Sequence, residues 1–128
     1  MRRRWLWMLV LGWCMALPCA WAQSIELQDA LFLHSDATSP PDGPAGWTPQ
    51  GLPDRWRDSR PNTDGSAWYR MQFERDALNR ELQAVLIPHA SVNAEVYLNG
   101  VLLGTGGSFE EPFSRTWNRP RMYLIAPE

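Results

Sequence analysis

The segment SRTWNRP, residues 114–120, gathers the side chains of this sequence that are best suited to binding a small molecule. The indole of Trp117 offers a flat apolar face of the kind that stacks on sugar rings. Arg115, Asn118 and Arg119 add hydrogen-bond donors for hydroxyl or carboxylate groups. These four residues predict a polyol or carboxylate site. The alternative is that Trp117 only anchors its loop by packing on the protein, and that Arg115 and Arg119 are exposed to solvent.

The other residues with chemical potential do not assemble into a catalytic or metal site. His34 and His89 are isolated, whereas a metal site needs several convergent ligands, so they are read as surface or turn residues. No nucleophile-elbow pattern occurs, and no serine can be paired with a base from its spacing. We therefore expect no catalytic residue, no metal and no cofactor.

No pair of carboxylates in the sequence has the features of a glycosidase acid and nucleophile, which that reaction requires. Glu110 and Glu111 are neighbours in a loop, and nothing in the sequence would raise the pKa of either. Asp54, Asp58 and Asp64 lie in a polar segment with no apolar pocket implied around them. The pattern predicts solvated loop acids.

The glycine-rich stretch GTGG, residues 104–107, does not fit a phosphate-binding loop. A dinucleotide fingerprint opens a helix, but here Phe109, two acids and a proline follow. A P-loop needs a lysine, and the chain contains none. We expect these glycines to be the flexible exit from a strand.

Residues 1–22 have the tripartite pattern of a secretory signal peptide. Arginines occupy positions 2–4, an apolar run covers residues 5–17, and Ala-Trp-Ala at 20–22 precedes cleavage before Gln23. The run is short for a membrane span of about 20 residues, which favours cleavage over an uncleaved anchor. Both cysteines lie in this segment, so the mature chain would have no disulfide and no thiolate.

The net charge of the mature chain argues against polyanionic partners. Loss of three arginines leaves nine basic against 14 acidic residues, a net charge of −5. An acidic surface disfavours nucleic acid and anionic lipid.

After residue 23 the chain has short alternating apolar runs and no long helical period. Strands are expected in residues 24–35, 67–74, 83–89, 94–98, 101–104 and 121–127, with a type I′ turn at Asn99-Gly100. Residues 36–54 hold five prolines and three glycines, too many for a regular element. They are read as an ordered loop, with a disordered linker as the alternative. The fold class is all-β, a jelly-roll β-sandwich of six or seven strands that lacks its last strand or strands.

The alternation also predicts which side chains are buried. Tyr69, Met71 and Phe73 should face the core from one side of their strand. Residues 83–89 should form a buried strand stopped by Pro88.

Four segments in order resemble a known family: LPDRW (52–56), GSAWYRMQF (65–73), EVYLNGVLLGTGG (95–107) and WNRP (117–120). Together they resemble the galactose-binding-like jelly-roll domain. It occurs as the sugar-binding domain of family 2 glycoside hydrolases and as the periplasmic sensor domain of 7TM-DISM-like histidine kinases and diguanylate cyclases. The closing G-x-N-x-L pattern of that domain is absent. The resemblance implies scaffold roles for Trp68, Tyr69, Arg70, Asn99 and Gly100, and it transfers no catalytic residue.

The resemblance implies that residues 23–128 are the N-terminal part of a non-catalytic ligand-sensing or carbohydrate-binding-like domain. The parent would be a membrane-bound signalling protein, with the domain in the periplasm, tethered to the inner membrane through a downstream segment. Two alternatives stay open: the sugar-binding part of a secreted glycoside hydrolase, and a stand-alone periplasmic binding protein. The expected partners are a small-molecule or carbohydrate ligand and the parent's membrane segment, and not nucleic acid.

Overall fold

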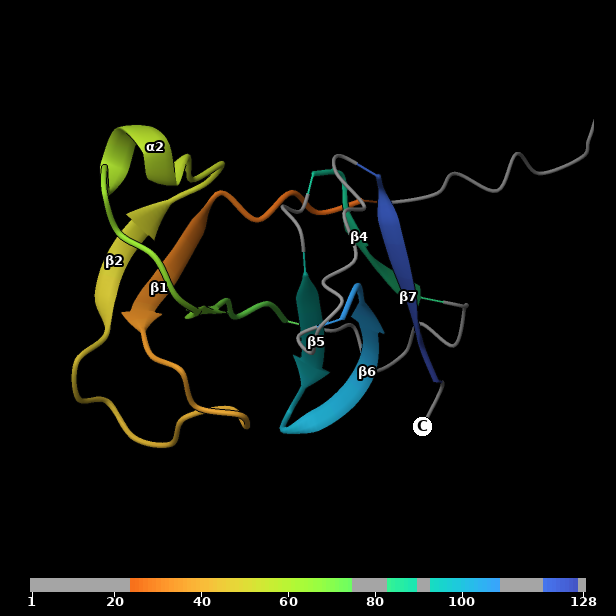
Figure 1. Ribbon diagram of the computed structural model, residues 1–128. Coiled ribbons are helices and arrows are strands. Elements are labelled where there is room, and N and C mark those ends of the chain that lie inside the picture. Colours follow the sequence, from red (N-terminus) through yellow and green to blue (C-terminus); the bar gives the residue numbers. More distant parts are fainter. Residues whose placement is uncertain (1–23, 75–82, 90–92, 109–118, 127–128) are drawn as a thin grey trace, which may run out of the picture.

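A computed structural model of the chain describes residues 24–74, 83–89, 93–108 and 119–126 (Figure 1). The described residues form seven strands and one short helix. The elements, in order, are β1 (Asp29–His34), β2 (Thr48–Gly51), α2 (Trp56–Ser59), β3 (Ala67–Arg70), β4 (Gln83–Ile87), β5 (Ala94–Leu98), β6 (Val101–Gly106) and β7 (Arg121–Ile125). The prediction of an all-β chain is confirmed for these residues. The signal-peptide segment and residues 75–82 lie outside them.

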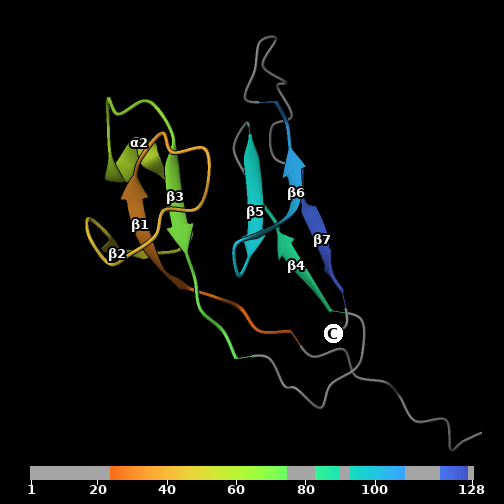
Figure 2. The ribbon, with the colours of Figure 1, turned by 90° about the horizontal axis from the view of Figure 1, so that it is seen from below.

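The strands form two groups that lie side by side (Figures 1 and 2). One group is an antiparallel three-stranded sheet in the order β2-β1-β3, with α2 beside it. The other contains two antiparallel ribbons, β4-β7 and β5-β6, which meet where β6 passes β7. A contact between the rings of Trp68 on β3 and Tyr97 on β5, 5.5 Å between centroids, links the two groups.

The first sheet has its core on one face of β1, because successive side chains of a strand point to opposite faces. Ala30 and Phe32 are 7% and 6% exposed, whereas Leu31 between them is 39% exposed. The ring of Phe32 makes edge contacts with Trp56 and Tyr69, at 5.9 and 5.4 Å between centroids. This aromatic cluster holds α2 against the face of the sheet formed by β1 and β3.

The turn at Asn99-Gly100 joins β5 to β6 as predicted. Both residues have positive φ, 49° and 82°, and the pair Leu98–Val101 closes the ladder beside them. Positive φ at both central positions is the requirement of the type I′ turn, which Asn and Gly tolerate.

The prediction that the following glycines form a flexible exit is wrong for Gly104 and Gly106, which lie within β6. The ring of Tyr123 covers Gly104, where a Cβ would come within 2.8 Å of a ring carbon. The guanidinium of Arg121 lies against Gly106 in the same way. The missing side chains therefore allow β7 residues to pack directly on the β6 backbone.

Three further expectations need correction. The proline-rich loop contains a strand, β2, because the segment 48–51 pairs with β1. β3 ends at Arg70, so Met71 and Phe73 lie beyond the sheet and are 42% and 41% exposed. β4 is half-buried on one face and exposed on the other, where Leu86 is 60% exposed.

The outer face of the β4-β7 ribbon is apolar and uncovered by the described residues. Leu86 pairs with Met122 and Ala84 with Leu124, and the two β7 residues are 67% and 57% exposed. On the inner face, Tyr123 and Ile125 are 9% and 5% exposed. Strands that are apolar on both faces are typical of sheets covered on both sides.

The only helix among the described residues is the four-residue α2, so that part of the chain contains no helix able to cross a membrane.

Candidate functional site

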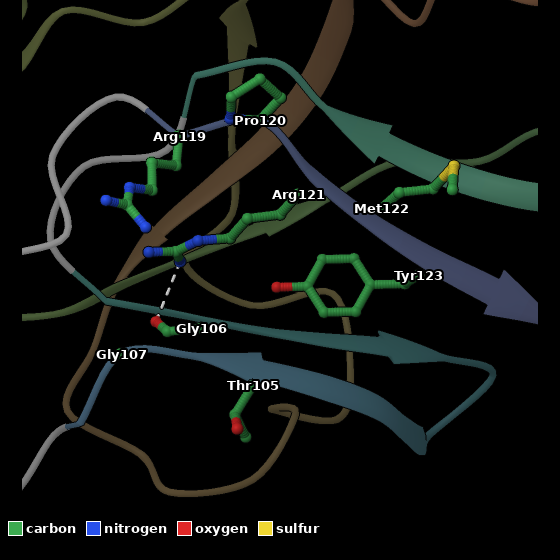
Figure 3. A pocket seen from close by; sticks show the side chains of 8 residues that line it. All are labelled: Thr105, Gly106, Gly107, Arg119, Pro120, Arg121, Met122 and Tyr123. Carbon is green, nitrogen blue, oxygen red and sulfur yellow. Dashed lines mark hydrogen bonds between the residues drawn. The ribbon is translucent and has the colours of Figure 1, made fainter.

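A pocket of about 370 Å³ lies where β6 ends and β7 begins (Figure 3). Its described lining consists of residues 105–107 on one side and residues 119–123 on the other. The pocket is a shallow depression that is widely open to solvent. Among the side chains predicted to bind a ligand, Arg119 is one that the structure places here.

Arg121 is held in a defined position on the pocket wall. Its Nη1 donates a hydrogen bond of 2.9 Å to the carbonyl oxygen of Gly106, and the side chain is half-buried. Because Gly106 has no Cβ, the guanidinium can lie flat on the strand. Arg121 is therefore a positioned cation and not a freely rotating surface arginine.

Tyr123 lines the pocket with a ring that is buried on β6. The residue is 9% exposed, and its hydroxyl has no hydrogen-bond partner among the described residues although water does not reach it. A buried polar group without a partner costs about 1–3 kcal/mol. Because water does not reach this hydroxyl, it is the ring of Tyr123 and not its oxygen that forms part of the pocket wall.

Arg119 stands at the exposed start of the segment that leads into β7. Figure 3 shows its guanidinium on the same side of the pocket as that of Arg121. The other predicted ligand-binding residues, Arg115, Trp117 and Asn118, lie outside the described residues. Sequence reasoning missed Arg121 and Tyr123, although the alternation R-x-R-x-Y over residues 119–123 carries the signal.

Two of the residues for which the sequence predicted a scaffold role, Trp68 and Arg70, contact the proline-rich segment. Trp68 Nε1 donates to the carbonyl oxygen of Ala37, at 3.2 Å. Arg70 donates to the carbonyl oxygens of Pro41 and Gly43, and its guanidinium carbon lies 4.0 Å from the ring centroid of Trp47. These contacts hold the proline-rich segment on β3, in agreement with its reading as an ordered loop.

A second polar cluster, on the other group of strands, is built around Asp54. Its carboxylate accepts hydrogen bonds from Tyr69 Oη at 2.6 Å, Arg60 Nη1 at 2.6 Å and Ser59 Oγ at 2.7 Å. The Asp54 side chain is 2% exposed, so the prediction that it is a solvated loop acid is wrong. The error arose because its partners converge only when the LPDRW segment folds over β1 and β3.

The cluster continues on both sides of the carboxylate. Trp56 Nε1 donates to Tyr69 Oη at 2.6 Å. Arg60 donates to Gln50 Oε1, and its guanidinium carbon lies 3.5 Å from the ring centroid of Phe32. Each polar group that Asp54 meets is thus engaged within the cluster, which points to a structural role.

The pKa shifts agree with that role. Burial alone would raise the pKa of Asp54, but the hydrogen bonds from Tyr69, Ser59 and Arg60, with the Arg60 charge, hold it below its ordinary value. Burial and the hydrogen bond to Asp54 raise the pKa of Tyr69 to about 12. Neither group changes charge near neutral pH, as a general acid or base would need to do.

The two histidines and the other loop acids that the structure describes are not arranged for catalysis or metal binding. His34 Nε2 lies 3.0 Å from the carbonyl oxygen of Asp64, which ties the β1 end to a loop. His89, Asp58 and Asp64 are exposed. No group of three or more His, Cys, Asp or Glu side chains in the described ranges is arranged to hold a metal ion. Glu110 and Glu111 lie outside those ranges.

Comparisons of the chain with protein-family models, curated proteins and solved structures find no match.

Proposed function

We propose that this chain is a non-catalytic ligand-sensing or carbohydrate-binding-like domain that works outside the cytoplasm. The observation that carries the proposal is the pocket between β6 and β7, where the guanidinium groups of Arg119 and Arg121 lie on the same side. Two guanidinium groups that lie together in a surface depression can supply the polar contacts that orient a small molecule. The polar clusters described above supply no activated acid, base or nucleophile.

The fold proposed for this function is a galactose-binding-like jelly roll preceded by a signal peptide. One support is the order of the four sequence segments. The other is that the described residues are almost all β, with Trp68, Tyr69 and Arg70 on β3 making hydrogen bonds to other parts of the chain. The signal-peptide pattern of residues 1–22 supports export. No cofactor is required for binding of this kind.

The parent protein is proposed to be a membrane-bound sensor histidine kinase or diguanylate cyclase. The exposed apolar face of β4-β7 supports attachment of the domain to further protein, because such a face is costly to leave in water. Ligand binding would then bias how the domain sits on the downstream membrane segment.

Calorimetric titration of the purified full chain tests the proposal, with a panel of neutral sugars, sugar acids and small carboxylates. We expect at least one of them to bind, and Trp117→Ala to weaken that binding, because its ring would stack on the ligand. If no member of the panel binds, the proposed function is wrong. If Trp117→Ala leaves every affinity unchanged, Trp117 is not part of the site.

A further inference from the structure

The ribbon formed by β5 and β6 has one face that is covered by β7 and one that is not. Tyr123 of β7 packs at Gly104, which pairs with Val96. Glu95 and Tyr97 flank Val96 on β5, so their side chains point to the opposite face. This second face therefore lies on the side of the ribbon away from β7.

The second face carries both aromatic and polar groups. Thr105 pairs with Glu95 and Leu102 pairs with Tyr97, and paired residues share a face. Glu95 and Thr105 are exposed, and Leu102 is 47% exposed. The ring of Trp68 on β3 joins this surface, with its centroid 5.5 Å from that of Tyr97 and an angle of 51° between the ring planes. We call these five residues the aromatic patch.

The two rings of the aromatic patch are held in position at their polar atoms. Trp68 Nε1 donates to the carbonyl oxygen of Ala37 at 3.2 Å, and the Tyr97 hydroxyl donates to Glu95 Oε2 at 2.8 Å. Both side chains are half-buried, so part of each ring is accessible. Side chains that are already fixed lose little conformational entropy when a ligand binds.

We infer that the aromatic patch binds a neutral sugar, whose ring packs on Tyr97 and Trp68 while its hydroxyl groups bond to Glu95 and Thr105. The inference rests on the proposed function and adds a second site and a ligand class to it. Aromatic rings are complementary to the apolar side of a sugar ring. A sugar hydroxyl can donate to the Glu95 carboxylate, and the threonine hydroxyl can donate or accept.

The charges around the aromatic patch favour a neutral ligand over an ion. Glu95 forms no salt bridge with any residue that the structure describes, so a ligand carboxylate beside it would meet a like charge. Arg70 lies two residues from Trp68 on the same face of β3, where it donates to the carbonyl oxygens of Pro41 and Gly43. A ligand cation on the Trp68 ring would meet that positive charge. A neutral sugar avoids both repulsions.

The test compares galactose and glucose with their uronates and with choline. Each is titrated calorimetrically into the purified full chain. The uronates keep the sugar ring and add a negative charge, and choline carries a positive charge that aromatic rings can bind. We expect at least one neutral sugar to bind about fivefold or more tightly than its uronate and than choline, since a like charge at short range costs that much affinity.

Two substitutions at Tyr97 separate ring stacking from general packing. Tyr97→Leu removes the aromatic ring but keeps an apolar side chain, and it should weaken neutral-sugar binding by about fivefold or more. Tyr97→Phe keeps the ring and should change the affinity by less than about twofold. The side chain is only half-buried, so both variants should fold, and urea denaturation verifies this.

A substitution of the acid tests the polar half of the site. Glu95→Ala should weaken neutral-sugar binding by about tenfold, because it removes a charged hydrogen-bond acceptor. The matched control is Asp58→Ala, which removes a carboxylate that is 61% exposed on α2. α2 packs on Phe32, on the face of the first sheet opposite to Trp68, so this variant should bind like the wild type.

The outcomes separate this inference from the proposed function. A uronate or choline that binds as tightly as the neutral sugars would overturn the ligand class. Unchanged affinity in Tyr97→Leu, equal losses in Tyr97→Leu and Tyr97→Phe, or equal effects of Glu95→Ala and Asp58→Ala would overturn the site. Each of these results leaves ligand binding by the domain standing. Failure of every ligand, including the wider panel, would reject the proposed function itself.

Discussion

The hydroxyl of Tyr69 donates a hydrogen bond of 2.6 Å to the carboxylate of Asp54, which is 15 positions earlier in the chain. This contact joins β3 to the segment between β2 and α2. It is the centre of the polar cluster that also contains Arg60 and Trp56, and it makes the stability of the first sheet depend on one buried carboxylate.

Replacement of Asp54 by alanine should destabilise the protein by about 3 kcal/mol, as breaking a buried charge pair does. The variant leaves the Arg60 guanidinium and the Tyr69 hydroxyl without their acceptor. Urea denaturation of both proteins measures the change in the free energy of unfolding. Asp58→Ala is the control, because Asp58 has a side chain that is 61% exposed, and its effect should stay within about 0.5 kcal/mol.

The carboxylate of Asp54 should also make the stability of the protein depend on pH in the acidic range. The pKa of Asp54 is lower in the folded protein than its ordinary value of 3.8. The carboxylate therefore stabilises the folded protein fully when the pH is above that ordinary pKa. The contribution is lost as the pH falls through the folded pKa. The stability advantage of the wild type over Asp54→Asn should therefore shrink between about pH 7 and pH 2. A constant difference across that range would contradict this explanation of the cluster.

Tyr69 should produce the opposite dependence in alkali. Its pKa is raised from 10.0 to about 12, so its contribution is fully present below pH 10 and is lost as the pH rises through about 12. The stability difference between the wild type and Tyr69→Phe should decrease over that interval. Unfolding in urea at about pH 8 and pH 11 measures it, and the other tyrosines cancel because both proteins contain them.

Gly104→Ala should destabilise the protein by about 1–3 kcal/mol, the usual cost of overpacking. The new methyl group would lie 2.8 Å from the Tyr123 ring, and the ring would have to leave the β6 backbone. Gly51→Ala is the matched control, since no atom lies within 4 Å of its Cβ position and its φ is not positive. That variant should be neutral or slightly stabilising. Equal effects of the two substitutions would show that close packing is not the reason for Gly104.

Export of the full-length precursor in a Gram-negative host should release a chain that begins at Gln23. The small residues at positions 20–22 fit signal peptidase, and the apolar run is short for a stable anchor. Mass spectrometry of the periplasmic fraction identifies the N-terminus. Recovery of the chain in the membrane fraction with residues 1–22 intact would instead support the uncleaved anchor.

Local patterns in the sequence determined the elements that depend only on neighbouring residues. The turn at Asn99-Gly100 followed from two residues that tolerate positive φ, and β7 followed from the alternating apolar run after Pro120. The all-β class followed from the absence of a helical period. These features need no knowledge of distant contacts.

Tertiary structure alone decided the roles of Asp54, Gly104 and Tyr123. The sequence predicts Asp54 to be a solvated loop acid, but in the structure it accepts hydrogen bonds from Arg60 and Tyr69. The sequence predicts the two glycines of β6 to be flexible, but Tyr123 and Arg121 pack on them. The physical reason is the same in each case. Burial and hydrogen-bond partnership are set by residues far away in the chain, and a residue type alone specifies neither.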